Sequence, residues 1–188
     1  MAAALDRATR WVQRSVEYWS EYAAATRDLT AHNTFTEPRT PPGGAPSIAY
    51  GGGCFELSPG EVLLVEHEVP DARYWNWSIH QMRWFDSGPW DQRAMSRNGH
   101  QVHVDDDGMV RLVVAGVDPG VPNWLDTNGR PVGLAVYRYV AGPRPSRCHG
   151  RPSFRWRSCR TICHRAPRLQ PAGGMRAARR EASQRRWS

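Results

Sequence analysis

The chain has 188 residues and a formal net charge of +7, and all 25 of its basic residues are arginines. Residues 142–188 carry 13 arginines and one acid, a formal +12, whereas residues 1–141 carry 12 arginines and 17 acids, a formal −5. No apolar run approaches the roughly 20 residues that span a bilayer, and the first residues lack the apolar core of a signal peptide. These totals argue against a membrane-spanning or secreted protein. They predict a cytoplasmic protein with one mildly acidic domain and a basic tail.

Residues 1–30 are predicted to hold one amphipathic helix, at 3–29. Apolar side chains recur at spacings of three and four from Leu5 to Trp19 and beyond, which is the period of one helix face. We expect the helix to pack on its own domain, with a partner-binding or lid helix as the alternative. The proline- and glycine-rich residues 31–45 are predicted to be a linker.

Residues 46–141 are predicted to form a β domain, because the apolar period there changes to two. Many short strands after one helix favour an antiparallel β-sandwich or jelly roll. The sequence DDDG predicts a hairpin turn, and the triple glycine GGG is expected to separate two strands. The strands are expected at 48–50, 54–57, 62–69, 73–80, 100–104, 109–116 and 132–140.

The strand RYWNWSIH carries a candidate ligand-binding surface. Alternation along a strand places its aromatic and aliphatic side chains on one face and a row of hydrogen-bonding groups on the other. Such a row either lines a ligand site or faces water as the solvated side of an antiparallel sheet. The row consists of Tyr74, Asn76, Ser78 and His80.

Carboxylates supply weak candidates for catalysis. Glu66 and Glu68 lie on one face of the strand VLLVEHEV, and Asp126 lies in the loop DPGVPNWLDTNGRP. Two carboxylates can hydrolyse a glycosidic bond when they flank it within roughly 5–10 Å. Most such carboxylates are simply solvated, so the sequence favours binding over catalysis.

The same loop contains Trp124, a large ring suited to stacking on a sugar or to filling a core. No cofactor motif is present. His100 and His103 are three apart, so on the predicted strand they would point to opposite faces. We therefore expect neither a metal site nor a cofactor.

Several short motifs within residues 44–141 form a pattern that is found together elsewhere. They are Tyr74-Trp75-Asn76, Asp107-Gly108, Asp118-Pro119-Gly120, Asn123-Trp124-Leu125 and Arg138. Through these motifs, residues 44–141 resemble a bacterial family known only as domain of unknown function number 1214. The resemblance implies a jelly-roll β-sandwich that usually closes a longer protein, and hence a larger N-terminal partner domain. It implies no settled activity.

The tail, residues 142–188, is predicted to be disordered or frame-shifted. Three of the four cysteines lie there, but their spacing does not match the compact CxxC knuckles of structural zinc sites. Its 13 arginines and scattered aromatics would suit nucleic acid, although the tail matches no nucleic-acid-binding module and the body is acidic. The absence of lysine is typical of a GC-rich genome, and a tail rich in Arg, Pro, Cys and Trp is what such a gene yields when it is read out of frame.

We interpret the chain as a non-catalytic module that binds a ligand, for example a glycan, or docks to a partner domain. The row at Tyr74–His80, together with Trp124 and Arg138, would carry the binding. A glycan hydrolase that uses Glu66, Glu68 or Asp126 is the first alternative. Nucleic-acid binding through the arginine-rich tail is the second.

The frame-shift hypothesis rests on the composition of residues 151–165 and is tested by sequencing the gene. We expect the codons for 151–165 to open, in a shifted frame, into an apolar and acidic segment with paired prolines. Codons that give no such segment would refute the hypothesis.

Overall fold

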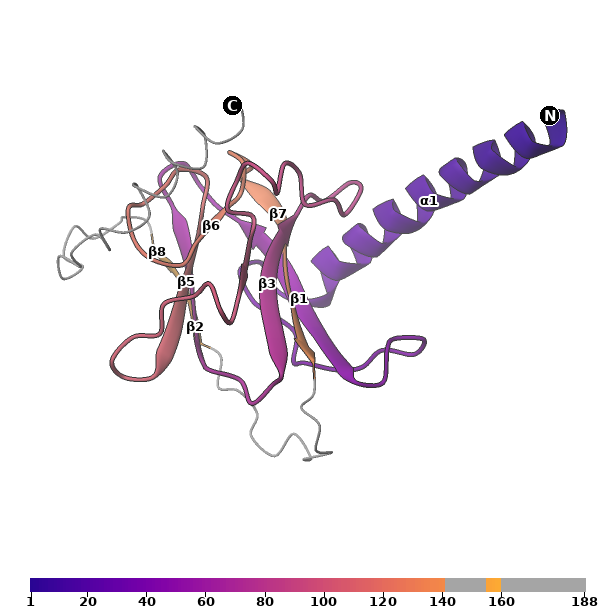
Figure 1. Ribbon diagram of the computed structural model, residues 1–188. Helices are drawn as coiled ribbons and strands as arrows, with labels where there is room; N and C mark the ends of the chain where they lie inside the picture. The colour runs from indigo at the N-terminus through magenta and orange to yellow at the C-terminus, as the bar shows by residue number, and fades with distance from the viewer. Residues whose placement is uncertain (141–154, 160–188) are drawn as a thin grey trace, which may run out of the picture.

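A computed structural model describes residues 1–140 and 155–159, and its architecture is mainly β with one long N-terminal helix (Figure 1). The helix is α1 (Ala2–Leu29). The remaining elements are the strands β1 (Ile48–Glu56), β2 (Val62–Glu68), β3 (Tyr74–His80), β4 (Ser96–Asn98), β5 (Met109–Ala115), β6 (Trp124–Asp126), β7 (Val132–Val140) and β8 (Arg155–Cys159).

The strands form two four-stranded sheets, ordered β1-β7-β3-β4 and β6-β5-β2-β8. All neighbours pair antiparallel except β5 and β6, which run parallel. Three short strands, β4, β6 and β8, were not predicted from the sequence. Within the tail, Arg155–Cys159 forms β8 against β2, whereas the rest of 142–188 and the frame-shift hypothesis lie outside the described residues.

Side chains from both sheets meet in one core. The alternation predicted for RYWNWSIH is confirmed, because Trp75, Trp77 and Ile79 are at most 4 % exposed and belong to the core cluster. The second sheet contributes residues of β2, β5 and β6 to the same cluster, among them Leu63 and Leu112. The indole nitrogen of Trp77 donates a 3.1 Å hydrogen bond to Nε2 of His67, which joins the two sheets inside this core.

The triple glycine lies within a strand instead of between two, which corrects the sequence prediction. A Cβ at Gly51 would overlap the ring of Tyr137, and one at Gly53 would overlap the carbonyl oxygen of Thr34. Glycine is needed here because another chain segment approaches the strand closely. The Tyr137 hydroxyl completes the arrangement by donating a 2.6 Å hydrogen bond to the carbonyl of Thr36.

The expected linker is bound to the edge of β1. The backbone N–H groups of Asn33, Thr36 and Arg39 donate to carbonyls of β1 at 2.8, 3.0 and 2.9 Å. These bonds cover an edge that would otherwise present unpaired backbone groups.

The strand expected at 100–104 is absent, which is a second correction. The N–H groups of Gln101 and Val102 turn back onto the carbonyl of Asn98. The Asn123 side chain accepts a hydrogen bond from the N–H of His103 and donates one to its carbonyl, at 2.7 Å each. The backbone donors and acceptors of this segment are therefore engaged by a turn and a side chain, so the expected hairpin does not form around the tight turn at 105–108.

Helix α1 packs on the body only through its last third, and its N-terminal half projects away from it (Figure 1). The expectation that the helix packs on its own domain therefore holds for its last third and is wrong for its N-terminal half. Ala23 and Thr26 are its buried residues, whereas Leu5 and Val12 are 62 % and 48 % exposed. Among the described residues no helix is long and apolar enough to cross a bilayer.

Candidate functional site

The outer face of the sheet β1-β7-β3-β4, the face turned away from the core, carries most of the predicted binding residues. Alternation places Tyr74, Asn76, Ser78 and His80 on this face of β3, opposite the buried tryptophans. Arg138 of β7 pairs in register with Asn76, and so lies on the same face. The structure thus brings together five of the six predicted ligand-binding residues.

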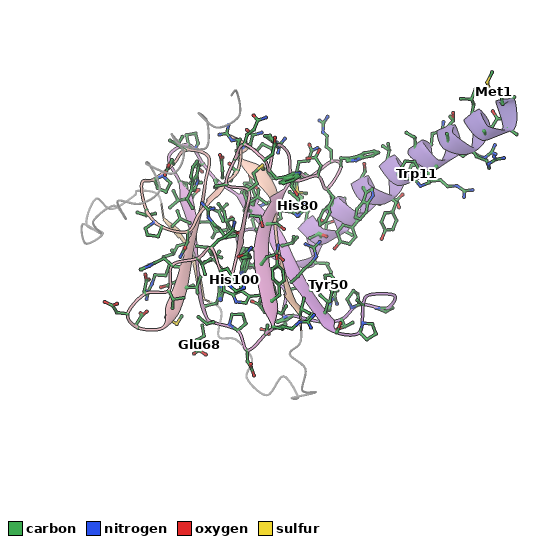
Figure 2. All side chains as sticks on the ribbon, in the orientation of Figure 1. Met1, Trp11, Tyr50, Glu68, His80 and His100 are labelled. Carbon is green, nitrogen blue, oxygen red and sulfur yellow. The ribbon has the colours of Figure 1, made fainter. Side chains whose placement is uncertain are left out.

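The two ends of this face differ. Ser78 and His80 are buried, at 6 % and 8 % exposed, whereas Tyr74 is 42 % exposed and Asn76 and Arg138 are half-buried. One of the two interpretations of the sequence was a continuous row of side chains facing water. This interpretation is wrong at the His80 end of the face. Figure 2 shows His80 and Tyr50 on the side of the body from which α1 leaves.

A stack of rings covers the buried end. The Phe85 ring lies between His80 and Trp19 of α1, with centroid distances of 4.5 and 5.4 Å and nearly parallel planes. Phe85 has a φ of 58°, a conformation that a bulky residue rarely adopts. The stack holds this backbone in place and anchors α1 to the sheet.

His80 is held as a neutral imidazole. Its Nδ1 lies 3.0 Å from the carbonyl of Phe85, which can only accept, so Nδ1 carries the proton. Its Nε2 then accepts from the Ser78 hydroxyl at 2.9 Å. Burial lowers the pKa of His80, and the neighbouring Arg138 lowers it further. Because Ser78 is buried and fully engaged, we assign this pair a structural role.

The open end of the face forms a register row across four strands. Tyr50 of β1 pairs with Arg138, Arg138 with Asn76, and Asn76 with Asn98 of β4. The Arg138 guanidinium lies 5.8 Å from the centroid of the Tyr50 ring. Sequence reasoning missed Tyr50 and Asn98. The glycines between Tyr50 and Cys54 hide any alternation in β1, and the three residues of β4 are too few to show a period.

Trp124 lies apart from the other predicted binding residues. It begins β6 at the edge of the second sheet, and its Nε1 donates a 3.0 Å hydrogen bond to the carbonyl of Ala115. The ring is half-buried and fastens β6 to β5. This position favours a packing role for Trp124.

Two of the candidate catalytic carboxylates, Glu66 and Asp126, lie too far apart to act as a pair. Glu66 pairs with Arg111 across β2 and β5, and Asp126 pairs with Ala115 across β5 and β6. Arg111 and Ala115 are four residues apart on β5, which separates the two carboxylates by about 13 Å along the strand. Glu68 is exposed at the C-terminal end of β2, two residues from Glu66 and on the same face. The separation between Glu66 and Asp126 exceeds the spacing that a glycosidase requires.

Each of these two carboxylates also has an arginine partner. Arg111 Nε lies 2.8 Å from Glu66, and its other nitrogens bind Asp105 and Asp107. Hydrogen bonds, first to Asp107 and then to Asp105 and Glu66, raise the pKa of Arg111 above its usual range. Asp126 is buried and lies 2.7 Å from Arg93 Nε. These ion pairs engage both carboxylates with arginines, so neither is free for a substrate.

A cavity of about 350 Å³ is lined by none of the predicted site residues. It lies between the β1–β2 turn and the segments 115–117 and 129–131. Among the residues that the structure describes, no group of three or more His, Cys, Asp or Glu side chains is arranged to hold a metal ion.

Comparison with solved structures finds a similar fold in a protein that is itself uncharacterised. The chain is similar to an uncharacterised protein from Burkholderia cenocepacia, with 28 % identity and a TM-score of 0.63 over 75 % of this chain and 38 % of that one. The VPA0106 protein from Vibrio parahaemolyticus matches 58 % of this chain and 30 % of its own length, with 17 % identity and a TM-score of 0.44. No protein-family model and no curated protein matches the chain. Because the match covers 38 % of the Burkholderia protein, this chain spans well under half of that protein's length.

The buried histidines predict a loss of stability on mild acidification. Burial lowers the pKa of both His67 and His80 in the folded protein, whereas an unfolded histidine titrates near about 6.5. The unfolded chain therefore binds protons first as the pH falls below about 6.5, and each histidine removes up to about 1.4 kcal/mol of unfolding free energy per pH unit. The stabilisation from each buried neutral histidine is therefore fully present above about pH 6.5. It decreases as the pH falls towards the lowered pKa of that histidine in the folded protein.

Urea unfolding at pH 7.5 and 5.5 measures this effect. We expect His67→Gln to flatten the pH dependence, because glutamine can accept from Trp77 without titrating. The exposed His100 (Figure 2) provides the matched control, and His100→Gln should leave the profile unchanged. An unfolding free energy that is equal at both pH values in the parent chain would contradict the prediction.

Proposed function

We propose that this chain is a non-catalytic docking module that presents helix α1 to a separate protein domain. Within this proposal the two sheets form a jelly-roll β-sandwich of the family known as domain of unknown function number 1214. Eight strands in two sheets around one core support the sandwich. The motifs around Asn76 and Arg138 support the family assignment.

One observation carries the docking proposal: the face of α1 that is buried on the body continues past the body without a partner in the described chain. Its last turns pack through Trp19, Ala23 and Thr26. We name the exposed continuation the distal stripe, which consists of Leu5, Ala8, Val12 and Val16. The spacings of three and four are kept throughout, so the stripe and the packed residues form one face.

An exposed apolar face of this length is typical of a helix that binds in a hydrophobic groove. Leu5, Val12 and Val16 are 62 %, 48 % and 42 % exposed, and Trp11 beside them is 69 % exposed. An isolated helix is only marginally stable in water, so an unpartnered half-helix gains most of its stability from binding.

The partner should be a folded domain with an apolar groove and an acidic rim. The distal half of α1 carries Arg7, Arg10 and Arg14 against the single acid Asp6, and a rim of opposite charge favours binding. A domain of this kind could occupy the part of the Burkholderia protein that this chain does not match, which is 62 % of that protein because the match covers 38 %.

The alternatives of the sequence analysis receive less support. The hydrolase hypothesis lacks a pair of free carboxylates, since Glu66 and Asp126 lie far apart and each binds an arginine. The nucleic-acid hypothesis rests on residues of the tail that lie outside the described range. A cytoplasmic location stays a proposal, in keeping with a protein partner.

Site-specific photo-crosslinking in the cells of the natural host tests the docking proposal. A photoreactive amino acid at Val12 should form an adduct with one other protein, identified by mass spectrometry, whereas the same probe at Gln13 should not. Gln13 is also exposed and lies on another side of the helix. Adducts only with a second copy of this chain, or none at all, would contradict the proposal.

Affinity for the identified partner then gives the energetic test. Val12→Asp should weaken binding by about tenfold or more, because it places a charge in an apolar interface. The matched variant Gln13→Asp adds the same charge outside the stripe and should bind like the parent chain. Equal affinities of the two variants would show that the distal stripe is not the interface.

A further inference from the structure

A second candidate surface lies at the open end of the outer sheet face. The register row Tyr50, Arg138, Asn76 and Asn98 crosses four neighbouring strands in the order β1-β7-β3-β4. Adjacent strands lie about 4.8 Å apart, so the row spans about 14 Å. That length is sufficient for a sugar ring with its substituents.

Arg138 is the cation at the centre of this row. It is half-buried, and among the described carboxylates none forms an ion pair with it. By contrast, Arg111 on the other sheet binds three carboxylates. A partly buried guanidinium without a counter-charge favours an anion, and its planar fork matches a carboxylate.

The Tyr50 ring fixes the position of this guanidinium. The 5.8 Å approach of Arg138 to the ring centroid restrains the arginine on the sheet surface. An arginine restrained in advance loses less conformational entropy when it binds a ligand.

Two asparagines extend the row on the other side of Arg138. In the described part of the chain the Asn76 side chain makes no hydrogen bond, and the only side-chain bond of Asn98 is its Oδ1 accepting from the N–H of His100 at 2.9 Å. Amide groups both donate and accept, as sugar hydroxyls do. The Tyr74 ring, 42 % exposed on the same face, offers an apolar surface beside them.

We propose that this row binds a sugar that carries a carboxylate, with the carboxylate on Arg138 and the hydroxyls on Asn76 and Asn98. The proposal defines the chemical class of the glycan-like ligand, which the sequence left open. It depends on the sheet surface alone, so it stands or falls independently of docking through α1.

NMR titration of the full-length chain with sodium D-glucuronate, D-glucose and sodium acetate at constant ionic strength tests the proposal. We expect glucuronate to shift the side-chain amide signals of Asn76 and Asn98 in a saturable manner. Glucose, which lacks the carboxylate, and acetate, which lacks the hydroxyls, should each bind at least about tenfold more weakly. Equal affinity for glucuronate and glucose, or for glucuronate and acetate, would overturn it.

Variants separate this site from general charge effects. Arg138→Gln should weaken glucuronate binding by about tenfold or more, whereas Arg10→Gln on α1, which removes the same charge, should have no effect. Asn76→Asp preserves the side-chain shape and places a carboxylate opposite Arg138, so it should block glucuronate without unfolding the sheet. Parent-like binding by either Arg138→Gln or Asn76→Asp would overturn the proposal.

Discussion

The hydrogen bond between Trp77 and His67 is the constraint on which the two-sheet arrangement depends. Trp77 Nε1 donates to His67 Nε2, and His67 Nδ1 lies 2.7 Å from the carbonyl of Glu68, so the imidazole must be neutral. Both side chains are fully buried, and their rings stack with centroids 5.8 Å apart. A buried polar group without a partner is costly, so this pair sets the position of β2 against β3.

The outer face follows from this arrangement. Because Trp75 and Trp77 face the core, the alternate residues of β3 must face outward, where His80 receives the Phe85–Trp19 stack. The stack fixes one end of α1 and covers one end of the face. The other end stays open around Arg138. Both proposed binding surfaces therefore come from one sheet: the projecting helix anchored at one end and the register row at the other.

Local sequence patterns predicted most of the long strands, but not which parts of the sheet surface are covered by other segments. The period of two gave β2, β3, β5 and β7, and it placed Asn76 and Arg138 among the binding candidates. The burial of His80 was not predictable, because it depends on Phe85 and Trp19, which reach it from a loop and from a distant helix. Three-residue strands show no period, and a glycine required by a distant tyrosine cannot be told locally from one that ends a strand.

Hydrogen exchange along α1 tests the central claim most directly, namely that the distal half of the helix has no partner among residues 1–140 and 155–159. We expect backbone amides before Val12 to exchange much faster in the purified chain than those from Trp19 to Thr26, which pack on the body. Binding of the partner domain should slow exchange in the distal half alone. Uniform protection along α1 in the purified chain would contradict the claim, because it would mean that the distal stripe is already covered.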